Sequence, residues 1–399
     1  MTQQKEKIAK AIDSMRDELL TLSHEIHDHP EIGFKEHQAV GFIRSFLEKH
    51  GFEVEVPYCG IETSFKAVKK GKGPGPRIAF LAEYDALRGI GHGCGHNIIA
   101  TCAVGAFSGL ATLMDEYDGE ISIIGTPAEE GGAGKVVLLE RGAFDETDYA
   151  LMMHPSGGGS NLVGRGGRAA TTIHVTFHGK SAHSSVPANG VNALSAGIHV
   201  FNQIDMMRPT FEVQDNINGV ILEGGTAANI IPALCRCEFS LRAETMLRIE
   251  ALIELVKSCV KRAESLTGAT AEVTVEPIYA ERYPNKPMCE AFKNNMASLG
   301  IEMTWPIPGK LYGSSDVGNV SIKIPAIHDY LSITDDGSIQ SHSIEYTEAA
   351  ASPEADEICI KGAKGLAMTA LDILECSDFR DEINAYHEAQ VPKEYKGKY

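Results

Sequence analysis

Cys94 and His96 stand in the glycine-rich segment GHGCGHN (91–97), and their side chains suit a metal ion. Thiolate and imidazole groups are common zinc ligands, and mixed ligand sets are frequent at catalytic metal sites. One glycine separates the two residues, and Gly93 and Gly95 give the backbone the freedom to bring both side chains to one ion. The alternative is a glycine-rich turn with a buried thiol.

The adjacent acids Glu129 and Glu130 offer a further ligand and a base. Neighbouring carboxylates repel each other unless positive charge lies between or beside them. One of them can bind a metal ion while the other takes the proton of a metal-bound water, whose pKa the metal lowers toward about 7. The alternative is a pair of solvated acids at the start of a helix, where the helix dipole favours negative charge.

These groups share one position, because each follows a short apolar run typical of a buried strand. The runs and the polar residues at their ends are RIAFLAEYD (77–85) with Glu83 and Asp85, EISIIGTPA (120–128) before the acidic pair, and YALMMHP (149–155) with His154. Sites in open parallel sheets form beyond the carboxyl ends of the strands, so we expect these side chains to lie together. A buried core histidine is the alternative for His154.

The runs alternate with helical segments, which predicts the fold class. Residues 97–114 and 136–142 are expected to be helices between the strands, and residues 350–374 form a long helical pattern near the end of the chain. Strand–helix–strand order with continuously apolar strands indicates an α/β domain whose central, mainly parallel sheet is covered on both faces.

A different pattern begins near Arg168. Strands with alternating apolar residues, such as TTIHVTFH (171–178) and CRCEFSLR (235–242), are interleaved with two amphipathic helices in the order βαββαβ. This is the ferredoxin-like arrangement, with one sheet face exposed. We therefore predict an inserted domain at 168–280 within a discontinuous domain formed by 1–167 and 281–399.

Three residues of the inserted domain are candidates for substrate contacts. His183 can donate a hydrogen bond to a developing oxyanion, and Arg242 can pair with a substrate carboxylate. Asn229 lies in GGTAANIIP (224–232) between two strands, where it contacts substrate or holds a turn. A histidine on a surface loop and a solvated arginine on a sheet are the alternatives for the first two.

Composition excludes several classes of protein. The net charge of −18 disfavours nucleic acid and anionic membranes as partners. The longest stretch without charge or histidine, 97–114, is too polar to span a bilayer, and the charged N-terminus does not resemble a secretory signal. Nine cysteines in a chain of 399 residues favour reduced thiols and a cytoplasmic location over a disulfide framework.

Ordered motifs along nearly the whole chain resemble those of the M20 metallopeptidases, and specifically the amidohydrolase branch that contains the aminobenzoyl-glutamate utilisation and β-alanyl-dipeptidase group. The matching segments are HDHPEIGFKEH (27–37), AEYDAL (82–87), GHGCGHN (91–97), GTPAEEGGAGK (125–135), MMHP (152–155), HGKSAHSSVP (178–187), GGTAANIIP (224–232), SSDVGNVS (314–321) and HSIEYTE (342–348).

The resemblance implies a zinc-peptidase-like catalytic domain interrupted by a lid or dimerisation domain. It implies Glu129 as general base, Asn229 and Arg242 as substrate-binding residues, and a homodimer in which His183 reaches the partner's active site and steadies the oxyanion. It also implies a site for two divalent ions, zinc or manganese with cobalt as a further option. The implied ligands are Cys94, His96, Glu130, His154 and His342.

The chain departs from the common family pattern at three positions. Glu83 stands where many relatives have the histidine of a His-x-Asp motif, and Cys94 and His96 replace that ligand, as in the amidohydrolase branch. Asn97 stands where that branch usually has aspartate, and Arg88 replaces a common proline. We do not count Asn97 as a ligand, since an amide is a poorer ligand than a carboxylate.

The resulting hypothesis is metal-dependent hydrolysis of the amide bond in a small N-acyl amino acid or a dipeptide-like substrate. A dipeptidase specific for dipeptides with a basic residue is one alternative. A second is thiol catalysis with Cys94 as nucleophile and His96 as base. A third is a catalytically inactive binding protein of the same fold.

Overall fold

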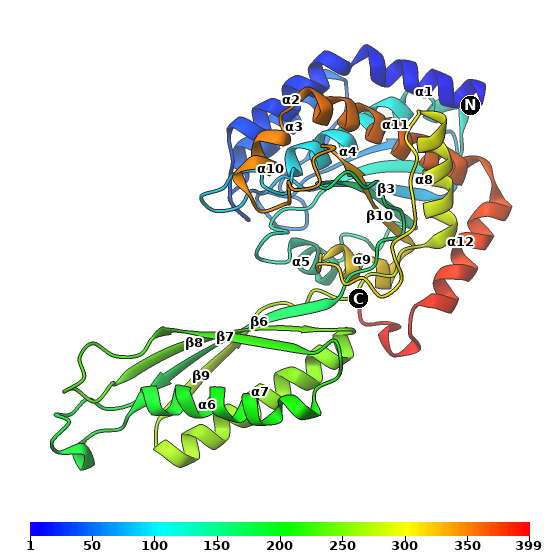
Figure 1. Cartoon of the computed structure of the whole chain (residues 1–399). Coiled ribbons are helices and arrows are strands. Elements are labelled where there is room, and N and C mark those ends of the chain that lie inside the picture. The colour runs from blue at the N-terminus through cyan, green and yellow to red at the C-terminus, as the bar shows by residue number, and fades with distance from the viewer. The chain divides into compact units, whose positions relative to one another are not determined.

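The computed structural model describes all 399 residues and falls into two compact units. The first unit consists of Met1–Gly166, Arg282–Tyr312 and Asp316–Tyr399. The second consists of Gly167–Glu281 together with the short segment Gly313–Ser315. Figure 1 shows the course of the chain through both units.

A six-stranded sheet in the order β1-β2-β4-β3-β5-β10 forms the centre of the first unit. The strands β4, β3, β5 and β10 are parallel to their neighbours, whereas β1 and β2 form an antiparallel edge. The expected mainly parallel sheet is therefore confirmed. The strands are β1 (Val54–Glu55), β2 (Lys66–Lys70), β3 (Arg77–Ala82), β4 (Glu120–Gly125), β5 (Tyr149–Ser156) and β10 (Ala326–Ser332).

Helices cover both faces of this sheet (Figure 1). Alternate strand residues point to opposite faces, so Phe80 and Leu151 join one apolar cluster while Leu81 and Met152 join another. The helices of the first cluster are α1 (Gln3–Ser14), α2 (Arg16–Asp28), α3 (His37–Lys49), α4 (His96–Ala111), α8 (Lys286–Ser298), α10 (Ile344–Ala349), α11 (Pro353–Glu375) and α12 (Ser377–Gln390). Those of the second are α5 (Gly134–Glu140) and α9 (Val317–Lys323).

The second unit has a four-stranded antiparallel sheet in the order β7-β8-β6-β9. Chain order is βαββαβ, which confirms the ferredoxin-like expectation. Its elements are β6 (Ala169–His178), α6 (Ala193–Met207), β7 (Asn216–Glu223), β8 (Leu234–Ala243), α7 (Met246–Thr267) and β9 (Thr270–Val275). Alternate residues of β6, such as Ile173, Val175 and Phe177, are buried beneath the two helices.

The strands that lead into the predicted site end earlier than the apolar runs suggest. β3 ends at Ala82 and β4 at Gly125, so Glu83, Glu129 and Glu130 lie in the loops beyond the sheet. Their side chains are therefore free to turn toward one another rather than alternate between the two faces. None of the helices combines the length and apolar character that crossing a membrane requires.

Candidate metal centre

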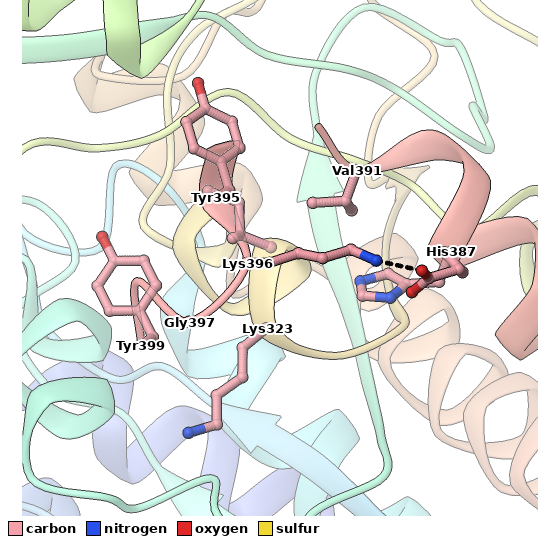
Figure 2. A pocket seen from close by; sticks show the side chains of 9 residues that line it. Lys323, His387, Val391, Tyr395, Lys396, Gly397 and Tyr399 are labelled. Carbon is pink, nitrogen blue, oxygen red and sulfur yellow. Dashed lines mark hydrogen bonds and ion pairs between the residues drawn. The ribbon is translucent and has the colours of Figure 1, made fainter. Parts of the chain in front are cut away.

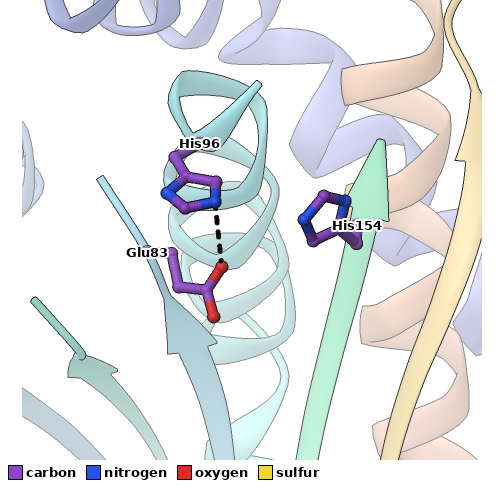
Figure 3. Close-up of side chains that lie close together, drawn as sticks. All are labelled: Glu83, His96 and His154. Carbon is purple, nitrogen blue, oxygen red and sulfur yellow. Dashed lines mark ion pairs between the residues drawn. The ribbon is translucent and has the colours of Figure 1, made fainter. Parts of the chain in front are cut away.

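The carboxyl ends of β3, β4 and β5 meet at one edge of the sheet, because β3 pairs in parallel with both neighbours. Glu83 follows β3, His154 lies at the end of β5, and His96 begins the helix α4. Figure 3 shows these three side chains pointing toward one another. Their candidate ligand atoms lie within 4.8 Å of one another, and His96 Nε2 is 3.5 Å from Glu83 Oε2.

A second group of three residues adjoins the first. Candidate ligand atoms of Cys94, Glu130 and His342 also lie within 4.8 Å of one another. Glu130 Oε2 is 3.7 Å from His342 Nε2, while Glu130 Oε1 is 3.7 Å from His96 Nε2. Glu130 therefore links the two groups, as a carboxylate shared between two metal positions would. The loop at His342 comes from far along the sequence, and its backbone N–H donates to Gly93 O at 2.8 Å.

Hydrogen bonds fix the orientation of both buried histidine rings. His96 Nδ1 donates to Asp85 Oδ1 at 2.9 Å, and His154 Nδ1 donates to the carbonyl oxygen of Pro155 at 2.6 Å. Since Nδ1 carries the proton in each neutral ring, Nε2 keeps its lone pair for a metal. A carboxylate or carbonyl behind a histidine ligand is the usual arrangement around protein-bound metals.

Three buried atoms of this centre have no hydrogen-bond partner: Glu83 Oε2, His96 Nε2 and Glu130 Oε1. Buried polar atoms are almost always hydrogen-bonded, so three of them side by side need an explanation. A divalent cation would satisfy all three, and thiolate, imidazole and carboxylate are the donors that zinc and manganese accept. The Glu130 side chain is only 12% exposed, so it is not a solvated acid as the alternative supposed.

The acids around the centre create a field that favours positive charge. Burial opposes a charge on His96, but the hydrogen bond from Asp85 and the charges of Asp85, Glu83 and Glu130 outweigh it and raise the pKa of His96 to about 10. Burial and the nearby acids, Glu130 first, raise the pKa of the Cys94 thiol. The residues thus fit a cation, which would displace the proton from His96 and lower the pKa of the thiol.

Lys135 is a buried cation beside the centre that the sequence analysis did not identify. Its Nζ donates to Glu83 Oε1 at 2.5 Å and to Asp316 Oδ1 at 2.8 Å, and its backbone N–H donates to Asp316 Oδ2. Carboxylate oxygens of Glu83, Glu129 and Asp316 lie within 4.8 Å of one another. The Lys135 ammonium therefore compensates acids that would otherwise repel each other. A lysine directly before the apolar run VVLL was the signal that marked it.

His183 and Asn229 lie on adjacent loops of the second unit. His183 pairs with Ile230 in an isolated β-bridge, and Asn229 O accepts a hydrogen bond from Ser184 N at 3.0 Å. The exposed ring of His183 accepts hydrogen bonds at Nδ1 from the backbone and the hydroxyl of Ser185. Its Nε2 therefore carries the proton and can donate. A pocket of about 520 Å³ beside these loops is lined by Ser184, Asn192, Leu194, 224–228 and 230–232.

Arg242 is half-buried on β8, and its Nη1 donates to Ser314 Oγ at 3.1 Å. Burial, together with the charge of Arg168, lowers its pKa. It is therefore not the fully solvated sheet arginine of the alternative. The three candidate substrate residues thus all belong to the second unit, whereas the candidate ligands belong to the first.

The departures from the family pattern at Asn97 and Arg88 have simple structural descriptions. Asn97 is buried, and its Nδ2 donates to Ser23 Oγ and to Ala350 O, both at 3.0 Å. Its amide group thus joins α4 to other parts of the first unit, in line with its exclusion as a ligand. Arg88 is exposed to solvent.

A further pocket of about 230 Å³ in the first unit contains none of the candidate residues. Figure 2 shows its lining, which includes Lys323, His387 and Lys396. Both lysines are already paired, Lys323 with Asp145 and Lys396 with Glu388. The pocket therefore offers no uncompensated charge to a ligand.

Comparisons with known proteins agree with this geometry. Residues 165–266 match the peptidase dimerisation domain of the M20 family. The mouse (Mus musculus) Xaa-Arg dipeptidase is 35% identical over 387 residues, which cover 93% of this chain and 89% of the relative. A p-aminobenzoyl-glutamate hydrolase from Escherichia coli (strain K12) is 29% identical over 73% of this chain and 65% of the relative.

Solved structures show the same fold. A Bacillus subtilis protein, a dinuclear metal-binding peptidase of the M20 family, superposes with a TM-score of 0.64 at 22% identity and covers 90% of this chain and 99% of its own. The centre described above has the donors that such a fold requires for divalent ions. The chain belongs to the M20 family of peptidases and amidohydrolases and is a metal-dependent hydrolase of amide or peptide bonds.

Proposed function

We propose that this protein hydrolyses the amide bond of small N-acyl amino acids or dipeptide-like substrates, with Glu129 as the general base. The observation that carries the proposal is the group formed by His96, Glu129 and Glu130, whose candidate atoms lie within 4.8 Å of one another. The proposed ligands of two divalent ions are Cys94, His96, Glu130, His154 and His342.

Two bound divalent ions would supply Lewis acidity for the scissile carbonyl and for a water molecule. Glu129 takes the proton of the attacking water and passes it to the leaving nitrogen. Burial, followed by the charges of Glu83, Glu130 and Asp316, raises the pKa of Glu129. A raised pKa makes this carboxylate a stronger base than a solvated glutamate. Cys94 favours zinc, while the carboxylates also accept manganese, and cobalt is a further option.

The relatives narrow the first substrates to test. The mouse relative acts on Xaa-Arg dipeptides, and the E. coli relative on p-aminobenzoyl-glutamate. The dipeptidase is the more similar of the two and is covered over more of its length. Dipeptides with a C-terminal arginine are therefore our first candidates, and p-aminobenzoyl-glutamate is the second.

We further propose a homodimer formed through the second unit, in which His183 of one copy steadies the oxyanion in the other. The match to a peptidase dimerisation domain supports this assembly. The strand β7 is an edge of its sheet, and its apolar residues Val220, Ile221 and Leu222 are 48%, 41% and 61% exposed. An exposed apolar edge strand is a typical surface for pairing with a second chain. The proton on His183 Nε2 is available to an oxyanion.

The decisive experiment combines metal analysis with turnover. About two divalent ions per chain are expected in gently purified protein, and chelation should abolish hydrolysis of Ala-Arg, p-aminobenzoyl-glutamate or an N-acetyl amino acid until metal returns. Glu129→Gln should lower kcat by about 100- to 10,000-fold while metal content is kept. Glu140→Gln, an exposed position on α5, is the matched control. Turnover that survives metal removal would favour thiol chemistry at Cys94, and absence of any turnover would favour a binding protein.

A further inference from the structure

Arg165 is a half-buried cation without an anionic partner in the first unit. Its guanidinium carbon lies 4.5 Å from the ring centre of Tyr312 and 4.1 Å from that of Tyr330. The group makes neither an ion pair nor a hydrogen bond within the protein, and its Nε is buried without a partner. Burial, and then the nearby charge of Arg282, lowers the pKa of Arg165. Buried charges are normally paired, so this guanidinium lacks its counterpart.

A second unpartnered donor lies close to Arg165. The phenol of Tyr346 is fully buried on α10, and its hydroxyl has no hydrogen-bond partner. Burial, Cys94 and Tyr330 raise the pKa of this phenol, and Arg165 lowers it in part. The hydroxyl therefore stays protonated and available as a donor, and it lies within electrostatic range of both the guanidinium and a proposed metal ligand.

The surroundings of these two donors are positive or neutral. Arg282 donates to His328 Nδ1 at 2.9 Å and to the Tyr330 hydroxyl at 2.7 Å. The neighbouring acid in sequence, Asp329, lies on the other face of β10 because side chains alternate along a strand. In a chain with a net charge of −18, a site with two guanidinium groups and no facing carboxylate is a receptor for an anion rather than a general feature of the surface.

The receptor adjoins the proposed metal centre. The ring of Tyr330 stacks on that of His154 with 5.1 Å between the ring centres, so a single aromatic ring separates Arg165 from a proposed ligand. An anion held by Arg165 would belong to the same bound molecule as an amide at the centre, because a small amino acid derivative spans this distance. The planar guanidinium fork matches a carboxylate.

We propose that Arg165, assisted by the Tyr346 hydroxyl, binds a carboxylate of the substrate and so restricts the enzyme to amides that carry a free carboxylate. This inference rests on the proposed function and assigns the carboxylate to the first unit. It differs from the expectation for Arg242, which belongs to the second unit. Arg165 acts here as a specificity-determining residue, and Tyr346 as a second donor to the same group.

The test measures binding without turnover. Glu129→Gln holoenzyme would be titrated calorimetrically with Ala-Arg and its C-terminal amide, and with Ala-Glu and Ala-Gln, in the presence and absence of Arg165→Met. We expect the acid to bind more tightly than its amide counterpart in at least one pair. Arg165→Met should weaken binding of that acid by about 10- to 100-fold and leave the amide within about twofold, because a charge-assisted hydrogen bond contributes only to the acid.

Additional variants separate recognition from folding. Arg165→Lys keeps the charge without the fork and should retain part of the acid preference, and Tyr346→Phe should lower it severalfold. Arg44→Met, at an exposed ion pair with Glu48, should change neither affinity. Thermal melting of each holoenzyme variant establishes that it is folded. Should Arg165→Met not fold, Arg165→Lys and Tyr346→Phe carry the same comparison.

Each outcome has a defined meaning. Loss of the Ala-Arg preference assigns the α-carboxylate to Arg165, and loss of the Ala-Glu preference assigns a side-chain carboxylate. A preference that persists in Arg165→Met but collapses in Arg242→Met would overturn the proposal in favour of Arg242. Equal binding of acids and amides by the parent protein would overturn it while leaving amide hydrolysis intact. Binding of neither acid at millimolar concentration, with no turnover by the wild type, would overturn both.

Discussion

Asp85 and His96 form a fully buried pair in which Asp85 Oδ1 lies 2.9 Å from His96 Nδ1. The other carboxylate oxygen of Asp85 accepts a hydrogen bond from the backbone of Glu130, also at 2.9 Å. One carboxylate therefore orients two proposed ligands, and Glu130 in turn links the two ligand groups. The hydrogen bond and charge of His96 hold the pKa of Asp85 below its ordinary value, although burial alone would raise it.

Asp85→Asn should weaken metal binding by about 10- to 100-fold, because an amide cannot accept from both His96 and Glu130 at once. Competition with a chromogenic chelator measures the affinity, and elemental analysis gives the occupancy. Asp148→Asn, which removes an ion pair with Arg77 at the opposite end of β3, is the matched control and should leave affinity unchanged. Equal affinities of the Asp85 variant and the wild type would show that Asp85 does not orient the ligands.

Lys135→Met should destabilise the protein by about 3–5 kcal/mol, since it leaves Glu83 and Asp316 buried without their cation. Urea denaturation of metal-free protein measures the change. Lys257→Met, at an exposed pair with Glu254, should stay within about 0.5 kcal/mol of the wild type. Combining Lys135→Met with Glu83→Gln and Asp316→Asn should recover part of the loss, and a single variant as stable as the wild type would contradict the assigned role.

The edge of the sheet that carries the site could be predicted from sequence because of one regularity. Parallel strands buried on both faces are apolar throughout, so the polar residues that follow them mark the strand ends. Glu83, Glu130 and His154 were found in this way, and the structure brings them together. Their roles as ligands and the role of Glu129 as base stay predictions that the experiments above address.

The remaining parts of the site depend on contacts between distant segments, which no local pattern reveals. His342 approaches Glu130 across more than 200 residues, and only the family resemblance named it. Lys135 and Asp316 meet across 181 residues. The strand β10, which brings Tyr330 to His154, was not predicted, although its parallel neighbour β5 was. Long-range pairing of this kind follows from the packed fold and not from residue spacing.

Gly134→Ala should disrupt the turn that carries Glu129 and Glu130. A Cβ at Gly134 would lie 1.7 Å from Pro127 O and 2.8 Å from Pro127 C, so the backbone of the turn must move. We expect loss of most activity and of bound metal with the overall fold retained in circular dichroism. Gly131→Ala in the same turn meets no atom within 4 Å and is the matched control. Similar kinetics for the two variants would mean that the turn tolerates displacement.

Asp329 should make stability depend on pH in the neutral range. Its side chain is buried beneath β10, and Oδ2 has no hydrogen-bond partner. Burial raises the pKa of Asp329 to about 7, although hydrogen bonds from Gly164 and Cys289 oppose the shift. The native state therefore holds a proton that the unfolded chain, with a pKa near 3.8, has already lost. Stability should then fall as pH rises from about 4 to about 7 and level off above that range.

Asp329→Asn removes this titration and keeps an acceptor for the backbone N–H of Gly164, which lies 2.8 Å from Oδ1. The variant should gain stability relative to the wild type as pH rises, by up to about 4 kcal/mol at pH 8. Urea denaturation of metal-free protein at pH 5, 6, 7 and 8 measures the difference. Parallel stability curves for the two proteins would show that the Asp329 carboxyl is ionised in the folded state throughout this range, and that its burial is compensated by its two donors.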